Sequence, residues 1–233
     1  MNFGQLKMYI DGELVSSVNN VTKEIYSPLN DERIATLSWA NSLDSERALK
    51  SAEQGFDTRS KTPVKKRKEW MLTLRDKILE KEEILRKSIS YEMGKPYGAT
   101  AEDIESITNS LKYYSDIIED YQKDKEIIDP DGTHNHHLVS KPIGVVVAYL
   151  AWNFPLLNAG FKLGPALASG CSIILKPSEL SPISLYIIGE ILHEINFPKG
   201  VVNILCGEPS EVATTLSKST LPKLITMIGS TET

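Results

Sequence analysis

Between residues 143 and 228 the sequence alternates short apolar runs with longer segments of helical periodicity. The apolar runs are Ile143–Leu150, Ser172–Leu175, Val201–Leu205 and Lys223–Ile228. Helical patterns separate them at Leu156–Ala168, Pro182–Ile195 and Ser210–Lys218. Strands that alternate with helices predict a parallel sheet with right-handed crossovers. Because the runs are apolar throughout, helices should cover both faces of that sheet, and the expected fold class is α/β, doubly wound.

The amino-terminal part reads differently. "LKMYIDGELV" alternates apolar and polar residues around Asp11-Gly12, which predicts a hairpin. A second pair of short strands is expected at Glu24–Tyr26 and Arg33–Trp39, and a long helical stretch at Pro63–Met93. A further helix is expected from Ile104 to Tyr121. Its apolar residues recur at steps of three and four, which predicts one buried face made of Ile104, Ile107, Leu111, Tyr114, Ile118 and Tyr121.

The stretch "KEIIDPDGTHNHHLVSKP" interrupts these helical patterns. It predicts an extended β arm, with Ile127–Ile128 and His136–Ser140 turning at Asp129–Thr133. Since a two-stranded hairpin is marginal alone, we expect this arm to pair with another chain. Its histidines complete no recognisable metal site, so no metal is predicted. The chain therefore divides into an amino-terminal part (1–123), the arm (124–141) and the parallel sheet (142–233).

Composition narrows the function classes. The net charge of −5 argues against a general nucleic-acid or anionic-membrane surface. No apolar run approaches the ~20 residues of a membrane span, and the start "MNFGQLKMYIDGELV" reads as neither leader nor signal. These features predict a cytoplasmic protein. The two cysteines, Cys171 and Cys206, lie in or beside apolar runs and are expected to be buried.

In an open parallel sheet, ligands bind beyond the carboxyl ends of the strands. That rule selects three turns: Trp152-Asn153-Phe154-Pro155, Lys176-Pro177-Ser178-Glu179 and Gly229-Ser230-Thr231-Glu232. A carboxylate after the second strand, here Glu179, suits the ribose hydroxyls of NAD. Lys176 could donate to the ribose or to a 2′-phosphate. Backbone N–H groups where a helix would follow Gly229 and Ser230 could hold a pyrophosphate.

Each of these turns also has a simpler interpretation. "KPSE" fits an ordinary strand-to-helix loop, and Gly229-Ser230 fits an ordinary helix start. Asn153 fits a helix N-cap ahead of Pro155, whereas its functional interpretation is an amide that donates to an oxyanion. Neither G-x-G-x-x-G nor G-x-x-x-x-G-K-[ST] occurs in the sequence, so neither phosphate-loop fingerprint applies.

Taken together, the motifs resemble the aldehyde dehydrogenase superfamily. The matching stretches are "PIGVVVAYLAWNFPLLNAGFKLGPALASG", "IILKPSE", "FPKGVVNILCG", "ITMIGSTET", "EMGKPYGATAEDI" and "YIDGELV". The resemblance covers essentially the whole chain. It implies the Rossmann-like fold of that superfamily, with NAD or NADP as cofactor, a small aldehyde as substrate, and a homo-oligomer (dimer or tetramer) held by an arm at residues 124–141.

The resemblance also implies roles for particular residues. Asn153 matches the asparagine whose amide stabilises the oxyanion, and Lys162 matches a lysine near the site. The implied cofactor-binding residues are Trp152, Asn153, Lys176, Pro177, Ser178, Glu179, Gly229 and Ser230. Glu179 should repel a 2′-phosphate and so favour NAD.

This sequence departs from the superfamily in two respects. Ala151 replaces the usual proline, a change found among members that oxidise semialdehydes such as succinate semialdehyde. The nucleophilic cysteine and the general-base glutamate of the superfamily would follow residue 233, and neither Cys171 nor Cys206 matches the nucleophile. The expected function is NAD(P)-dependent oxidation of an aldehyde to a carboxylic acid in the intact enzyme, this chain alone being inactive. The alternatives are a non-catalytic nucleotide-binding or assembly module, and an acylating or reductive relative.

Overall fold

The computed structural model describes residues 1–230, and a six-stranded sheet in the order β11-β8-β9-β10-β2-β3 runs through that part of the chain. Its parallel strands are β8 (Val145–Tyr149), β9 (Ser172–Lys176), β10 (Val202–Ile204) and β11 (Pro222–Met227). An antiparallel hairpin of β2 (Met8–Ile10) and β3 (Glu13–Val15) extends the sheet beside β10. The α/β class and the parallel sheet expected from the sequence are confirmed.

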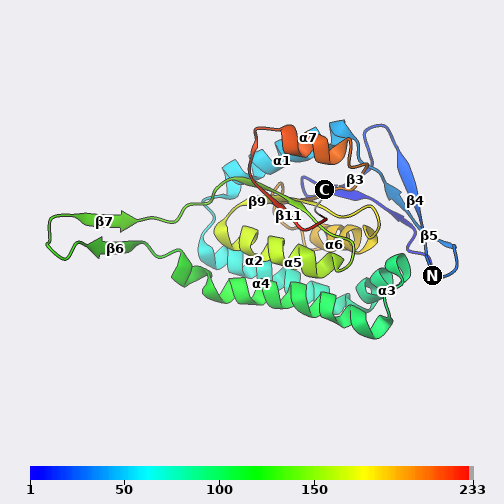
Figure 1. The fold of residues 1–233 in the computed structure, drawn as a ribbon, viewed down its shortest axis with the longest axis horizontal. Helices are drawn as coiled ribbons and strands as arrows, with labels where there is room; N and C mark the ends of the chain where they lie inside the picture. The colour runs from blue at the N-terminus through cyan, green and yellow to red at the C-terminus, as the bar shows by residue number, and fades with distance from the viewer. Residues whose placement is uncertain (231–233) are drawn as a thin grey trace.

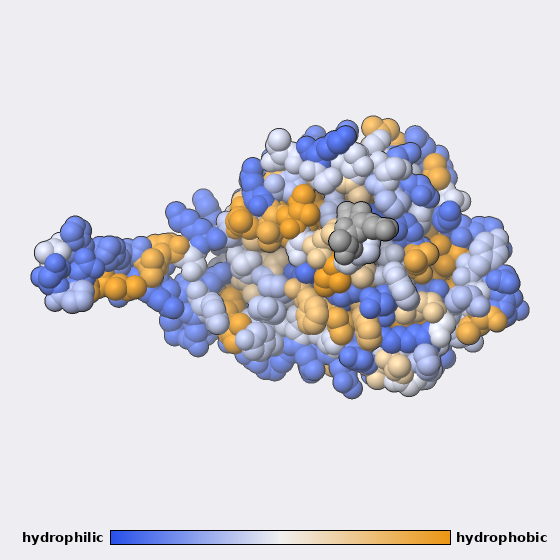
Figure 2. Space-filling model, viewed as in Figure 1, coloured by the Kyte–Doolittle hydropathy of each residue, from blue (hydrophilic) through white to orange (hydrophobic). Residues whose placement is uncertain are grey.

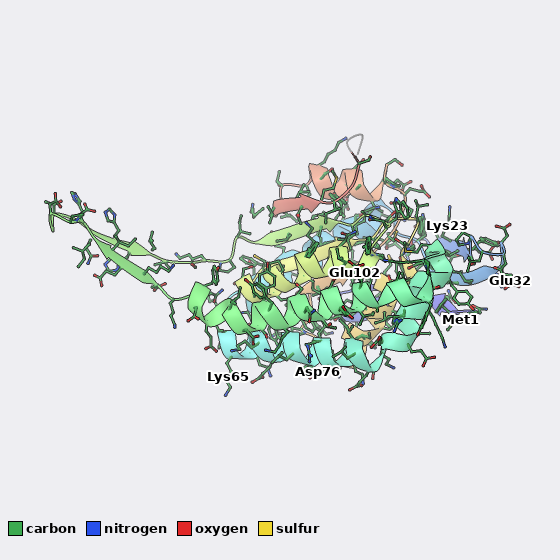
Figure 3. All side chains as sticks on the ribbon, turned by 60° about the horizontal axis from the view of Figure 1, so that its bottom comes forward. Met1, Lys23, Glu32, Lys65, Asp76 and Glu102 are labelled. Carbon is green, nitrogen blue, oxygen red and sulfur yellow. The ribbon has the colours of Figure 1, made fainter. Side chains whose placement is uncertain are left out.

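Helices cover both faces of this sheet (Figure 1). On one face lie α5 (Pro155–Ser169) and α6 (Ile183–Glu194), and on the other lie α1 (Ser42–Arg59) and α7 (Val212–Lys218). Behind α5 and α6 a further layer holds α2 (Val64–Glu80), α3 (Glu82–Met93), the 3-10 turn η1 (Tyr97–Thr100) and α4 (Ala101–Tyr121). Figure 3 shows this outer layer from below, with Lys65, Asp76 and Glu102 pointing into solvent. Among residues 1–230, no helix is both long enough and apolar enough to cross a membrane.

Helices α4 and α5 pack closely because glycines face the contact. A Cβ added to Gly160 would lie 2.8 Å from the Cα atom of Ile107, and one added to Gly164 would overlap the hydroxyl oxygen of Ser110. That hydroxyl donates to the carbonyl oxygen of Gly160 at 2.6 Å. The close approach fixes the position of α5, which begins at the turn after β8.

Two smaller β structures complete the fold. One sheet has the order β1-β5-β4, built from Gln5–Leu6, Arg33–Ser38 and Thr22–Tyr26. The other is the hairpin of β6 (Lys125–Ile128) and β7 (Asn135–Leu138), which projects away from the body (Figure 1). Every residue of its two strands is exposed, and Figure 2 shows apolar side chains along it.

Two helix predictions need correction. The single stretch expected at Pro63–Met93 is two helices, because the chain turns at Lys81 so that α2 packs against α4 while α3 packs against α6. The stripe expected on α4 is buried at its isoleucines and leucine, but Tyr121 is 72% exposed. It lies in the last turn of α4, where the chain leaves the helical layer for the arm.

Candidate functional site

An open cavity of about 1080 Å³ lies at the carboxyl ends of β8, β9 and β11. It brings together the three turns that the sequence selected. From those turns its lining includes Trp152, Asn153, Lys176, Ser178, Glu179, Gly229 and Ser230. Residues 231–233 of the third turn, where a helix start was expected, lie outside the described residues.

The first turn joins β8 to α5 and is held by its own neighbours. Asn158 is buried on α5, and its side-chain amide donates to the carbonyl oxygen of Ala151 at 3.2 Å. Trp152 is half exposed and Asn153 is exposed, both towards the cavity. Their side chains are therefore accessible to a ligand, while the backbone just before them is held by the hydrogen bond from Asn158.

The N-cap interpretation of Asn153 is wrong. The cap position of α5 is Phe154, and the free N–H groups of Leu156 and Leu157 donate to the Asp103 carboxylate at 3.1 and 3.3 Å. Asp103 reaches them from α4, with its other oxygen 2.7 Å from the ammonium of Lys95. A distant carboxylate thus does the work that the sequence assigned to Asn153, and the amide of Asn153 is left to face the cavity.

The second turn places an ion pair at the cavity wall. Lys176 is only 5% exposed, and its ammonium contacts the Glu179 carboxylate while donating to the carbonyl oxygen of Pro177 at 3.3 Å. Glu179 is partly exposed. The pair offers a fixed cationic donor beside an accessible carboxylate, a combination suited to vicinal hydroxyl groups. Pro177 is buried and contributes its carbonyl oxygen to the inner side of this turn.

Two contacts tie the first and second turns together. The hydroxyl of Ser181 donates to the carbonyl oxygen of Trp152 at 2.9 Å. The backbone of Leu150 donates to the carbonyl oxygen of Lys176 at 3.1 Å. The start of α6, just beyond Ser181, is held by Glu92, whose side-chain carboxyl oxygen accepts from the backbone of Ile183 at 2.7 Å.

Sequence reasoning missed one wall of the cavity. Helix α7 and the segment before it also line the cavity, with Pro209, Ser210, Ala213, Thr214 and Ser217. Tyr149 at the end of β8 donates its hydroxyl to the carbonyl oxygen of Ala213 at 3.0 Å, and burial raises the pKa of that hydroxyl. The usable signal was the helical spacing of small residues, since a face without bulk leaves room for a ligand.

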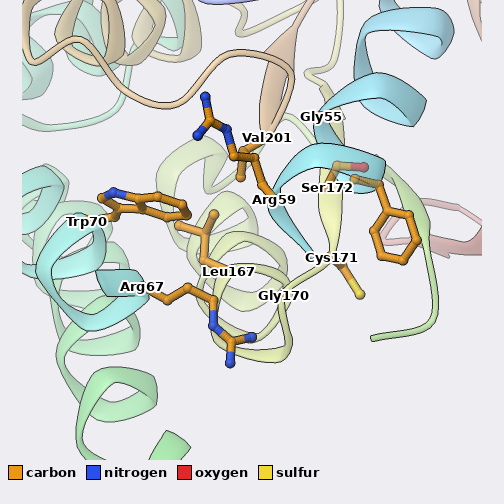
Figure 4. A pocket seen from close by; sticks show the side chains of 10 residues that line it. Gly55, Arg59, Arg67, Trp70, Leu167, Gly170, Cys171, Ser172 and Val201 are labelled. Carbon is orange, nitrogen blue, oxygen red and sulfur yellow. The ribbon is translucent and has the colours of Figure 1, made fainter. Parts of the chain in front are cut away.

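Neither cysteine reaches the cavity lining. Cys206 is fully buried behind the second turn, where its Sγ atom lies 3.6 Å from the carbonyl oxygen of Pro177, and burial raises its pKa to about 12. Cys171 borders a separate small hollow (Figure 4), where Arg59 and Arg67 point in opposite directions. The expected burial of both thiols is confirmed. A thiol with a raised pKa is a poor nucleophile at neutral pH.

Lys162 and the arm histidines were the other candidates. Lys162 lies on α5, partly buried, with its pKa lowered by desolvation, and it is absent from the cavity lining within residues 1–230. On the arm, both His134 and His136 contact the Asp129 carboxylate: His134 Nδ1 lies 3.3 Å from Oδ2, and His136 Nε2 lies 3.1 Å from Oδ1. No group of three or more potential metal ligands gathers in the described part of the chain.

This geometry, a parallel sheet with an ion pair and an asparagine converging at its carboxyl edge, agrees with the sequence family of the chain. The family model for the aldehyde dehydrogenase family matches residues 15–233, so the chain belongs to the aldehyde dehydrogenase family. A 3,6-anhydro-alpha-L-galactose dehydrogenase from Vibrio sp. (strain EJY3) is 30% identical over 97% of this chain and 47% of its own length. The chloroplastic betaine aldehyde dehydrogenase of Amaranthus hypochondriacus is 33% identical over 97% of this chain and 47% of its own length.

Solved structures agree. Betaine aldehyde dehydrogenase from Staphylococcus aureus, in complex with NAD⁺, superposes with a TM-score of 0.89 at 34% identity, over 95% of this chain and 44% of that one. A 3,6-anhydro-L-galactose dehydrogenase in complex with NADP gives 0.90 at 29% identity, over 98% of this chain and 48% of that one. The Rossmann-like aldehyde dehydrogenase fold is therefore confirmed. The chain spans about half the length of the relatives it matches.

Proposed function

We propose that this chain binds NAD(P) in the cavity at the carboxyl edge of its sheet, as the cofactor-binding part of an enzyme that oxidises an aldehyde to a carboxylic acid. The observation that carries the proposal is the convergence of Lys176, Glu179, Trp152 and Asn153 on one cavity. Its volume of about 1080 Å³ exceeds the roughly 300–1,000 Å³ of typical ligand sites, which leaves room for a dinucleotide. Relatives solved with NAD⁺ and with NADP support this ligand class.

The second turn would hold the adenosine ribose. In this proposal Glu179 accepts from the ribose hydroxyls and Lys176, fixed by burial, donates to them, with Pro177 and Ser178 shaping the turn. A carboxylate at this place repels a 2′-phosphate, so NAD is the favoured cofactor. Gly229 and Ser230 would meet the pyrophosphate.

The first turn would face the reacting end of the cofactor. The bound nicotinamide supplies the hydride acceptor of the reaction. Trp152 borders that ring, and the Asn153 amide donates to the oxyanion that forms on the aldehyde carbon, an interaction that strengthens in the transition state. Lys162 is assigned to the neighbourhood of this site on the resemblance alone. The nucleophile and the general base would come from sequence after residue 233.

The remaining parts of the proposal concern substrate, assembly and location. Ala151 favours a small semialdehyde, such as succinate semialdehyde, over the aldehydes that the relatives are named for. The chain would be organised as an amino-terminal part (1–123), the arm (124–141) and the sheet (142–233). The exposed hairpin of the arm would pair with another copy of the chain. Placement in the cytoplasm stays a prediction.

The direct test is calorimetric titration of the purified chain with NAD and NADP. We expect NAD to bind more tightly, and Glu179→Gln to move the ratio of the two dissociation constants towards NADP. Glu24→Gln, an exposed carboxylate on β4 away from the cavity, is the matched control and should leave the ratio unchanged. A Glu179 variant with an unchanged ratio would place the ribose elsewhere, and a chain that binds neither cofactor would contradict the proposal.

Measuring NADH formation distinguishes an aldehyde-oxidising enzyme from a non-catalytic module. We expect the chain alone to form no NADH from any aldehyde, and in the intact enzyme we expect Asn153→Ala to lower kcat by roughly 10²–10³. Asn153→Asp replaces the amide donor with an acceptor, so a normal kcat in that variant would remove the oxyanion role. NADH formation by the chain alone, lost when Cys171 or Cys206 is replaced by serine, would show that the nucleophile is one of these two.

A further inference from the structure

Helices α5 and α6 follow the first and second turns of the candidate site, and the N-terminal N–H groups of both are bound by side chains from elsewhere in the chain. The cap positions are Phe154 and Pro182, and neither side chain accepts a hydrogen bond from the helix start in the described part of the chain. At the start of α5 the backbone N–H groups of Leu156 and Leu157 donate to Asp103. At the start of α6 those of Ile183 and Ser184 donate to Glu92. Because unsatisfied N–H groups at a buried helix start are costly, the carboxyl groups of Asp103 and Glu92 determine where each helix can begin.

Asp103 is fixed before it reaches α5. Its side chain is fully buried, and the ammonium of Lys95, itself only 10% exposed at the side chain, lies 2.7 Å from its second oxygen. The same ammonium lies 3.4 Å from the centre of the Phe154 ring. One cation thus contacts both the capping carboxylate and the residue next to Asn153. The first turn of the site is held from two sides by one ion pair.

Glu92 does the same for α6. It is 4% exposed, and its two oxygens accept from the backbone of Ile183 at 2.7 Å and of Ser184 at 3.4 Å. Glu92 and Asp103 belong to one short segment, from the last turn of α3 to the first turn of α4. A single segment outside the sheet therefore holds the starts of both helices that follow the first two cofactor-facing turns.

We propose that Asp103 and Glu92 are positioning residues that set the turn at Trp152–Phe154 and the turn at Lys176–Glu179 relative to each other. The inference rests on the proposed NAD site. A dinucleotide that spans both turns needs their separation fixed in advance, since a turn that must be ordered on binding lowers affinity. Loss of one of the two carboxyl groups should weaken the binding of only that part of the ligand that its own turn contacts.

The experiment titrates the 233-residue chain with NAD and with AMP, which carries the adenosine ribose but no nicotinamide. We expect Asp103→Asn to weaken NAD by roughly tenfold, the equivalent of one charge-assisted hydrogen bond, and AMP by less than about twofold. Glu92→Met, which removes both acceptors at similar size, should weaken NAD and AMP alike. Glu92→Gln keeps an acceptor and should leave the affinities for NAD and for AMP close to those of the wild-type chain.

The matched control is Asp44→Asn. Asp44 is also fully buried and also a capping carboxylate, but it accepts from Ser17, Val18 and Asn41 at the start of α1, away from the two turns. It should lower the melting temperature and leave both affinities unchanged. Equal losses of NAD and AMP in Asp103→Asn, or a loss of NAD in the control as large as in Asp103→Asn, would overturn the proposal.

Amide hydrogen exchange tests the same proposal without a ligand. In Asp103→Asn we expect faster exchange at residues 150–158 than in the control, measured at matched stability. If Asp103→Asn does not fold, Lys95→Met should give the same faster exchange at residues 150–158. Lys95→Arg, which keeps the positive charge, should show the exchange rates of the wild-type chain. Unchanged exchange at 150–158 would overturn the positioning role, whereas a wild-type chain that binds no NAD, with the exchange result intact, would contradict only the proposed function.

Discussion

Helices α1 and α5 pack on opposite faces of the same sheet and begin in opposite ways. At α1 the cap is local: the Asn41 side chain accepts from Leu43 and Asp44, and the Asp44 carboxylate accepts from the backbone of Asn41. At α5 the cap comes from Asp103, on another helix and far back in the sequence. The first residue of a locally capped helix is determined by its own sequence, whatever the surrounding fold. The first residue of a helix capped from a distance is determined by the tertiary structure, and both helices that follow the turns of the candidate site, α5 and α6, are capped in this way.

The largest effect expected from this difference concerns stability. Asp103→Ala leaves Lys95 as an unpaired, largely buried cation and should cost about 3–5 kcal/mol of unfolding free energy. Asp44→Ala removes a buried carboxylate whose partners are neutral, and should cost about 1–3 kcal/mol. Urea denaturation of the two variants measures both losses. Equal losses would mean that the ion pair adds nothing to the distant cap.

The second expectation is a dependence on pH. Burial raises the pKa of Glu92 from 4.5 to about 8, with the charge of Asp103 adding to the effect. The folded chain therefore keeps a proton that the unfolded chain releases above pH 4.5, so the free energy of unfolding should fall as pH rises from about 4.5 to about 8. Glu92→Gln carries no such proton and should lose that part of the slope. Urea titrations at about pH 5, 6.5 and 8 would show it, and identical slopes would place the pKa of Glu92 near its usual value.

The local cap provides a smaller effect. Asn41→Ala should cost about 1 kcal/mol of unfolding free energy, because one side-chain acceptor at a helix start is lost. NAD affinity should not change, since α1 does not line the cavity in which we propose that NAD binds. Chemical denaturation and calorimetry together decide the matter. A loss of NAD affinity here would mean that local and distant caps affect the site alike.

The smallest effect is expected for an exposed ion pair on the helix that carries Asp103. Lys112 and Asp116 are four residues apart on α4 and more than half exposed at the side chain. Breaking the pair with Lys112→Met should change the unfolding free energy by at most about 0.5 kcal/mol, and the change should shrink in salt. A loss as large as that of Asp103→Ala would show that burial is not what makes the Asp103 pair important.

The same contrast explains what the sequence predicted well. Strand and helix alternation after residue 143 depends on local patterns of apolar residues, and it identified β8 to β11 and the helices between them to within a few residues. The rule that ligands bind beyond parallel strands then brought Asn153, Glu179 and Gly229 to one cavity. Each of these inferences uses only neighbours in sequence or a general property of sheets.

What the sequence could not predict depends on contacts between distant residues. Asn153 has the residue type and the spacing of a cap, and only the position of Asp103 shows that it is none. No glycine or proline marks the break at Lys81, so the sequence carries no local signal for it. The break separates α2, which packs chiefly against α4, from α3, which packs against α6, α4 and η1. The small residues of α7 have a helical spacing that the sequence shows, but which side of that helix faces the cavity depends on how α7 packs against the rest of the chain.

The order of strands has a consequence for the newly made chain. Tyr9 of β2 pairs with Ile204 of β10, so the first hairpin joins the sheet only after residues beyond 200 have left the ribosome. At roughly 5–20 residues per second this takes about 10 to 40 seconds. Throughout that interval Met8, Tyr9 and Ile10, all fully buried in the finished protein, can pair with β3 but not with β10. The hairpin of β2 and β3 thus waits for a sheet partner nearly 200 residues later in the chain, and a chaperone that shields residues 8–15 should raise the yield of folded protein more than one that acts on β8 or β9.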